Sequence, residues 1–136
     1  MTYLLDTNAC VHILNGTSAP VASRFARQCP ATVRLCSVVK AELLYGARKS
    51  ARVASTLAAL ERFFAPLASL PFDDDCAAEY GLLRADLERA GTPIGANDLM
   101  IAAIARHHDL AVVTHNVDEF SRVVGLRVED WELPEP

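Results

Sequence analysis

The sequence of 136 residues has no cysteine pair at metal-binding spacing and no apolar run long enough to cross a membrane. Its four cysteines form no Cys-x-x-Cys pair and have no histidine at ligand spacing, which argues against a zinc finger or a dithiol redox motif. Asp6 interrupts the N-terminal apolar stretch too early for a secretory signal peptide. We therefore expect a cytoplasmic protein with reduced thiols and no membrane contact.

Basic residues are also scarce, because 13 lysines and arginines face 17 acids and give a net charge of -4. This balance argues against a protein that coats nucleic acid through bulk charge, which needs clustered Lys and Arg. It does not exclude an enzyme with local basic patches. Two clusters are candidates, although either could equally be a solvated helix face: Arg24, Arg27 and Arg34, and Arg48, Lys49 and Arg52.

Hydrophobic residues, in contrast, are abundant. They make up 51% of the chain against 22% charged residues, a balance opposite to that of disordered segments. The length suits one domain that can bury a core without disulfides or a structural metal. We expect a single domain over residues 1–136, without internal repeats.

Short apolar runs alternate with helical patterns along the chain. The strongest strand is Leu110–Thr114, which is apolar almost throughout, as expected for a central parallel strand. The other predicted strands are Tyr3–Leu5, Val33–Cys36, Leu70–Phe72 at an edge, and a weak Leu126–Val128. The predicted helices are 38–47 with Ser37 as N-cap, 51–64, 73–91, 96–108 and 118–123, and a proline-bounded tail follows at 133–136.

Strands that alternate with helices imply parallel β-α-β units. The predicted fold is therefore an α/β protein, a three-layer α/β/α sandwich with a mainly parallel central sheet of four to five strands. In such sheets, ligands bind at the carboxyl ends of the strands. Polar residues at this edge are therefore site candidates.

Three carboxylates in apolar surroundings are expected at that edge. Asp6 ends the first strand, Glu42 lies early in the helix after the second strand, and Asp98 opens the buried helix before the strongest strand. Residues 114–116 emerge beside them. Because clustered carboxylates repel one another, a divalent cation would resolve the conflict, and oxygen ligands suit Mg²⁺ or Mn²⁺. Such a site is typical of phosphoryl-transfer chemistry.

Each acid also has a purely structural interpretation. Asp6 could hydrogen-bond a turn through Thr7 and Asn8. Asp98 could be only a helix N-cap, a role that Asn97 could also fill. Glu42 could be an exposed residue paired with Arg48 or Lys49. The convergence of the three acids on one sheet edge favours a site.

Four ordered motifs and the chain's ending now establish a resemblance to the PIN-domain family, and in particular to VapC-type toxins, over essentially the whole chain. The motifs are Leu4-Leu5-Asp6-Thr7-Asn8, the segment from Ser37 to Ala47, the segment from Ile94 to Ala102, the segment from Val113 to Phe120, and an ending from Leu126 to Trp131.

The resemblance implies that Asp6, Glu42 and Asp98 are the acids that coordinate a divalent metal, Mg²⁺ or possibly Mn²⁺, and orient the hydrolytic water. The fourth acidic position departs from the family pattern. Many PIN domains have an aspartate where this chain has Asn116, while VapC-like sequences often have a later acid, here Glu119 or possibly Asp118. Occupancy of a second metal site is therefore left open.

The resemblance also implies a metal-dependent endoribonuclease that acts as the toxin of a toxin–antitoxin pair, with a tRNA or ribosomal RNA substrate. It implies inhibition by a small VapB-like antitoxin and assembly as a homodimer. Tyr45 and apolar faces on the following helix could form a groove for a partner helix, although core packing explains most of these residues equally well: Leu57, Leu60, Phe63 and Phe64.

Other functions compete with this interpretation. A phosphatase with Asp6 as covalent nucleophile is disfavoured. Such enzymes have an Asp-x-Asp motif and a catalytic lysine, whereas this chain has Asn8 at the second position and no suitably placed lysine. A non-catalytic RNA- or protein-binding module with a PIN-like fold is a second alternative. Thiol chemistry at Cys10, with His12 and His115, has no supporting motif. His115 could instead contact RNA phosphate near the site.

Overall fold

The computed structural model describes residues 1–134, so the last two residues of the predicted tail at 133–136 lie outside the described residues. Within residues 1–134, the sheet has five strands, all parallel, in the order β3-β2-β1-β4-β5. The strands are β1 (Tyr3–Leu5), β2 (Val33–Cys36), β3 (Ala68–Leu70), β4 (Ala111–Val113) and β5 (Arg127–Glu129).

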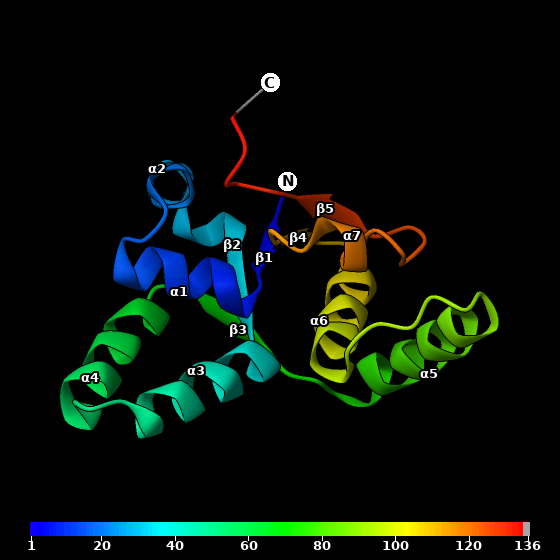
Figure 1. Cartoon of the computed structure of the whole chain (residues 1–136), viewed down its shortest axis with the longest axis horizontal. Helices are drawn as coiled ribbons and strands as arrows, with labels where there is room; N and C mark the ends of the chain where they lie inside the picture. The colour runs from blue at the N-terminus through cyan, green and yellow to red at the C-terminus, as the bar shows by residue number, and fades with distance from the viewer. Residues whose placement is uncertain (135–136) are drawn as a thin grey trace.

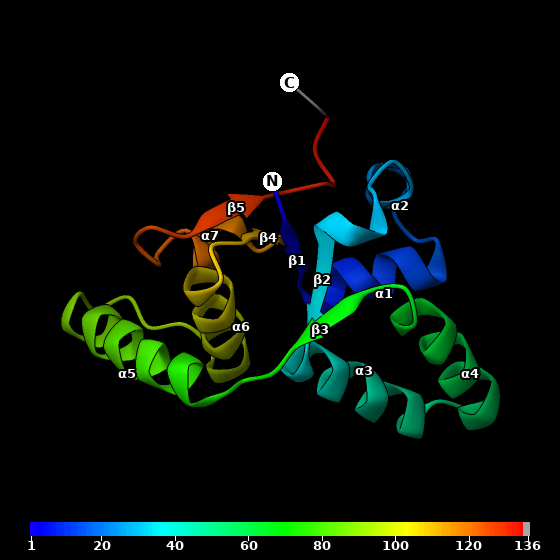
Figure 2. The same cartoon turned by 180° about the vertical axis from the view of Figure 1, so that it is seen from behind.

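Helices cover both faces of this sheet. The four N-terminal helices lie to one side of β1 and β2, and the three C-terminal helices lie to the other (Figures 1 and 2). The predicted three-layer α/β/α sandwich is therefore confirmed. The α-helices in the described part of the chain are α1 (Thr7–Asn15), α2 (Ala19–Ala26), α3 (Ser37–Lys49), α4 (Val53–Phe64), α5 (Asp74–Arg89), α6 (Ala96–His107) and α7 (Val117–Phe120).

The centre of the sheet fixes where the acids lie. Strand β1 pairs with β4 in parallel, with Leu4 opposite Val112 and Leu5 opposite Val113, and these four side chains are fully buried or nearly so. Their burial holds the register, because a slip of one residue would turn apolar side chains away from the core. The residues that follow these two strands must therefore emerge side by side.

Two helices were missed by the sequence prediction. The polar run Asp6-Thr7-Asn8 is the start of α1 rather than a turn, because the Asp6 carboxylate accepts the Ala9 N–H as an N-cap. Ser18 caps α2 in the same way, and Pro20 stands in its first turn. Both helices begin with a capping residue, but each is too short to show a clear apolar periodicity, so neither was predicted from the sequence.

Several predicted boundaries were wrong. Ser37 is the first residue of α3 and not its cap, since its hydroxyl accepts the Phe72 N–H from the segment after β3. Strand β3 ends at Leu70, one residue before Pro71, because proline has no N–H to donate to the sheet. Helix α7 and strand β5 are also shifted by one residue or more from the predicted ranges 118–123 and 126–128.

No helix within residues 1–134 is long and apolar enough to span a membrane.

Candidate active site

Asp6 is held at the carboxyl end of β1. Its N–H donates to the Val113 carbonyl at 3.1 Å, which continues the β1–β4 ladder by one residue. Its Oδ1 accepts the Ala9 N–H at 2.8 Å, and the side chain is only 5% exposed. Asp6 therefore serves as the cap of α1, and this bond fixes the orientation of its carboxylate.

Asp98 approaches from the opposite layer. Helix α6 begins at Ala96 with Gly95 as a cap that makes no side-chain bond, so Asp98 stands in the first helical turn and is not the N-cap. A crossover helix runs antiparallel to the next strand, so the start of α6 is expected at the end of β4, and Asp98 there is close enough to Asp6 for the two charges to interact. A carboxylate in this turn is favoured by the helix dipole.

Glu119 completes the cluster from α7. Its Oε1 accepts the Gly95 N–H at 2.7 Å, and its Oε2 accepts the side-chain amide of Asn116. Asp118, in contrast, pairs with Arg122 at 3.1 Å and has a 90% exposed side chain. Of the two later acids, Glu119 is therefore the one that lies beside Asp98, and Asn116 orients it.

Glu42 reaches the site from the first part of α3. Its Oε1 is buried, and so is the Thr7 hydroxyl, and neither has a hydrogen-bond partner among the described residues. The alternative in which Glu42 pairs with Arg48 or Lys49 is not observed. An orphaned buried carboxylate oxygen is costly unless something else satisfies it.

The electrostatics show that the four acids converge. Burial, followed by the charges of Glu119, Asp6 and Glu42, raises the pKa of Asp98 to about 6. Burial also raises the pKa of Asp6, against hydrogen bonds from the Thr114 hydroxyl and the Ala9 N–H that lower it. Like-charge repulsion and desolvation of this kind mark a cluster built for a counter-charge.

The donor set fits a hard divalent cation. The converging groups offer only carboxylate, hydroxyl and amide oxygens, which are the ligands of Mg²⁺ and Mn²⁺ rather than of softer metals. A bound divalent cation would satisfy the orphaned Oε1 of Glu42 and offset the repulsion that raises the pKa of Asp98. The residues present therefore fit the metal that the sequence predicted.

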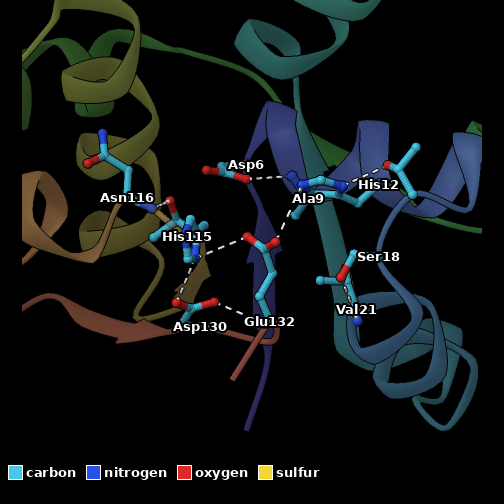
Figure 3. A network of polar contacts seen from close by, with 11 residues as sticks. Asp6, Ala9, His12, Ser18, Val21, His115, Asn116, Asp130 and Glu132 are labelled. Atoms are coloured by element: carbon cyan, nitrogen blue, oxygen red, sulfur yellow. Dashed lines mark hydrogen bonds and ion pairs between the residues drawn. The ribbon is translucent and has the colours of Figure 1, made fainter. Parts of the chain in front are cut away.

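Two other sequence hypotheses meet geometry that disfavours them. Cys10 is fully buried, and burial followed by the Asp6 charge raises its thiol pKa well above the ordinary value, so the thiolate needed for nucleophilic chemistry is suppressed. His115 lies against Asp130 and Glu132, at 2.9 and 3.1 Å, rather than in a cationic surface (Figure 3).

Two grooves flank the acids. One, of about 430 Å³, runs between α3 and α6 and is lined by Val38, Glu42, Tyr45 and Met100 among others. The second, of about 210 Å³, lies where α1, α3 and α4 meet, and its lining is mainly apolar: Val11, Leu14, Leu43, Ala47 and Leu60, with Thr7 and Glu42 at one end. Glu42 is the one acid of the cluster that lines these grooves, and it lines both of them.

Some of the predicted partner-groove and basic residues are exposed in the structure, and others are engaged in contacts within the fold. Tyr45 is 64% exposed, whereas Leu60 is buried and Phe63 packs on Phe25. Arg24 lies over the Trp131 ring and pairs with Glu129, so it is engaged within the fold. The cluster of Arg48, Lys49 and Arg52 is exposed at the end of α3 and the loop after it.

Two threonines contribute hydroxyls to the site, although neither of them was assigned a role there from the sequence and only Thr114 was placed at this edge. Thr7 was considered only as part of a turn, yet its hydroxyl is buried beside Glu42. Thr114 links the site together, because its Oγ1 accepts the Asn116 N–H at 2.9 Å while its hydroxyl bonds Asp6. The signal for both was their place directly after a strand or beside a strand-ending acid.

The sequence of this chain matches the PIN domain family over residues 3–126. Sequence relatives agree. The chain is 40% identical over 133 residues to the "tRNA(fMet)-specific endonuclease VapC" of Salmonella typhimurium, covering 96% of this chain and 98% of that relative. It is 37% identical over 131 residues to "Ribonuclease VapC2" of Haemophilus influenzae, with the same coverage.

Solved structures lead to the same group. The DNA-bound VapBC complex of Salmonella typhimurium matches with a TM-score of 0.89 and 38% identity, over 96% of this chain and 98% of that one. VapBC2 of Rickettsia felis, bound to a fragment of its promoter DNA, matches with a TM-score of 0.88 and 34% identity, over 96% and 99%. The chain belongs to the PIN-domain family, and within that family to the VapC group.

Proposed function

We propose that this chain is a metal-dependent endoribonuclease that hydrolyses RNA phosphodiesters at the acidic cluster and acts as the toxin of a toxin–antitoxin pair. The observation that carries the proposal is the convergence of four acids from separate elements, in which burial and mutual repulsion raise the pKa of Asp98 to about 6. The cluster is destabilising without a cation, and relatives at 37–40% identity are named as VapC ribonucleases.

Asp6, Glu42 and Asp98 are the proposed metal ligands. Asp6 offers Oδ2, because its Oδ1 is used by the Ala9 N–H, and Glu42 offers the buried Oε1 that has no partner among the described residues. A divalent ion bound here, Mg²⁺ or Mn²⁺, would polarise the scissile phosphate and lower the pKa of the attacking water.

Glu119 and Asn116 are proposed to position the rest of the reaction. The Gly95 N–H and the Asn116 amide each hold one oxygen of Glu119 in place. The fixed carboxylate would then orient Asp98 and the attacking water. The Asn116 amide adds no charge, and its exposure leaves it able to contact substrate. We propose that Glu119, not Asp118, is the fourth acid of the site.

The substrate is proposed to be a structured RNA, and tRNA is the first to test because a relative at 40% identity is named as specific for tRNA(fMet). The strand would enter along the groove between α3 and α6, where Lys49 lies over the ring of the lining residue Tyr45. Local cations of this kind contact phosphate without requiring a net positive protein.

The partner is proposed to be a VapB-type antitoxin. The apolar groove between α1, α3 and α4 suits an amphipathic helix, and it ends at Thr7 and Glu42, so a segment seated there would block the acids. Structural neighbours are VapBC complexes. We also propose that residues 1–136 act as a single domain and that the chain assembles as a homodimer.

Cleavage of RNA by the purified chain tests the activity. Total RNA and isolated tRNA(fMet) are incubated with Mg²⁺, with Mn²⁺ and with EDTA, and the products are resolved on a gel. Discrete fragments that require the metal are expected. Intact RNA under every metal condition would favour the non-catalytic binding module, which also predicts that Asp6→Asn leaves all activity in cells unchanged.

A further inference from the structure

A second cluster of metal-ligating side chains lies beside the acidic site, at the end of the described chain. His115 follows β4, and Asp130 and Glu132 follow β5 (Figure 3). Nδ1 of His115 lies 2.9 Å from Oδ2 of Asp130 and 3.1 Å from Oε2 of Glu132. One atom from each of the three residues lies within 4.8 Å of the others.

A second histidine faces the same cluster. Nε2 of His12, on α1, lies 3.7 Å from Oε1 of Glu132. The other ring nitrogen of His12 is 2.7 Å from the Thr17 hydroxyl. A hydrogen bond of this kind to one imidazole nitrogen orients the ring and leaves the opposite nitrogen available as a ligand.

The Asp130 carboxylate is held in place by a backbone hydrogen bond. The side chain of Asp130 is only 8% exposed, and its Oδ1 accepts the Glu132 N–H at 2.9 Å. This bond leaves Oδ2 directed at His115. Three parts of the fold therefore bring together the His115 imidazole and the carboxylates of Asp130 and Glu132, with the His12 imidazole beside the other oxygen of Glu132.

We propose that His115, Asp130 and Glu132, with His12 beside them, form a binding site for a late first-row divalent cation such as Zn²⁺, separate from the acidic cluster. Imidazole nitrogen combined with carboxylate oxygen is a donor set that Zn²⁺ binds well and that Mg²⁺ avoids. The acidic cluster, with only oxygen donors, has the opposite preference. The two sites would therefore take different metals.

The distances suit a small tetrahedral ion. Zinc bonds of about 2.0–2.1 Å to nitrogen and oxygen place neighbouring ligand atoms roughly 3.3 Å apart. The observed separations at His115, 2.9 and 3.1 Å, and the 3.7 Å at His12 bracket this value. Small shifts of side chains are enough to admit the ion.

A metal at this place would join three parts of the molecule, because it would connect α1, the end of β4 and the segment after β5. Asp6 lies close enough for its charge to act on His115. Zn²⁺ would therefore stiffen one wall of the acidic site without occupying it, and it should stabilise the fold by linkage.

Equilibrium dialysis of the full chain with Zn²⁺ tests the proposal, in excess Mg²⁺ so that the oxygen-only cluster is occupied. We expect one saturable Zn²⁺ per chain and a rise in melting temperature. His115→Ala should weaken Zn²⁺ binding by about 10-fold or more and abolish the rise, and Glu132→Gln should also weaken it. His115 is exposed, so its variant is expected to fold.

Two controls separate this site from others. His108→Ala, at the far end of α6, removes another exposed histidine and should leave Zn²⁺ binding unchanged. Asp98→Asn, in the acidic cluster, should leave it unchanged as well. Absence of saturable binding, unchanged affinity in His115→Ala, or binding lost in Asp98→Asn would overturn the proposal and leave the cluster as an ion pair only.

Discussion

Asp6 carries two duties that usually fall to different residues. Its Oδ1 caps α1 through the Ala9 N–H, while the same buried carboxylate stands among three other acids. Capping explains why an aspartate stands at the start of α1. It does not explain why this carboxylate is buried among others that repel it. Asp6 therefore has a structural role in capping α1 and a proposed chemical role in the acidic cluster.

Asp98 gives a prediction on stability. Its raised folded pKa, about 6, means that the folded chain binds this proton more tightly than the unfolded chain, so stability falls as pH rises from about 4 to about 6. Without metal at pH 7, Asp98→Asn should therefore be more stable than wild type by about 1 kcal/mol, a figure reduced because the carboxyl is half-exposed. Urea unfolding measures the difference.

The sign of this difference is open to a direct check. At pH 4 the gap between wild type and Asp98→Asn should close, because the wild-type carboxyl is then protonated in the fold. At pH 7, Mg²⁺ should stabilise the wild type and have little effect on the variant. A metal-free variant that is less stable than wild type at pH 7 would contradict the account.

At the scale of elements, α7 decides which acid joins the site. Its one turn directs Glu119 toward the Gly95 N–H and Asp118 toward Arg122. The two adjacent acids therefore provide a test variant and a control variant. Glu119→Gln should lower the rate of RNA cleavage by about 10-fold or more, whereas Asp118→Asn should leave it within about twofold. Equal losses in both variants, or none in Glu119→Gln, would refute the assignment.

Helix α3 supplies a prediction on the partner groove. Gly46 lines that groove, and a Cβ added there meets nothing within 4 Å, which is equally true of Gly81 on α5. Leucine at either position should stabilise its helix by about 0.5–1 kcal/mol. Gly46→Leu, however, should fill the groove and weaken antitoxin binding by roughly 10-fold or more.

Gly81→Leu is the control for this experiment, because it makes the same change on a helix away from the groove. Affinity is measured by titration with a VapB-type antitoxin that neutralises the wild-type chain. Both variants should retain RNA cleavage, and Gly46→Leu should resist inhibition. Unchanged affinity of Gly46→Leu would show that the antitoxin binds elsewhere.

Elements with strong periodicity or clear stop signals could be predicted from the sequence, and short ones could not. Helices α4 and α6 and strand β4 were placed within a residue or two, since Pro66, Gly95 and the apolar run at 110–113 mark them. Helices α1 and α2 were missed because each has two turns or little more. The shift of β3 arose because Pro71 was taken as a strand member.

For the whole molecule, topology carries the site. The strand order β3-β2-β1-β4-β5 sets Asp6 beside Thr114, and α3 and α6 bring Glu42 and Asp98 close enough for their charges to interact with one another. That convergence of Asp6, Glu42 and Asp98 was predictable from the alternation of elements. The choice of Glu119 over Asp118 was not, because it depends on which way one helical turn faces.

The cluster around His115 could not be predicted from the sequence either. Its members come from α1, from the loop after β4 and from the segment after β5, and no spacing in the sequence joins them. Only the parallel pairing of β4 with β5 brings Asp130 to His115. Contacts that depend on how side chains meet across elements require the structure.

The most direct test of the central claim is the RNA cleavage rate of wild type, Asp6→Asn and Asp6→Ala in Mg²⁺, measured beside their unfolding free energies. Asparagine keeps the cap of α1, so Asp6→Asn should remain folded and lose more than about 100-fold in rate, beyond the loss expected for a residue that only orients a ligand. Asp6→Ala should lose the same rate and about 1 kcal/mol of stability besides. If Asp6→Asn cleaves RNA as fast as wild type, Asp6 is a cap alone and the acidic cluster is not the catalytic site.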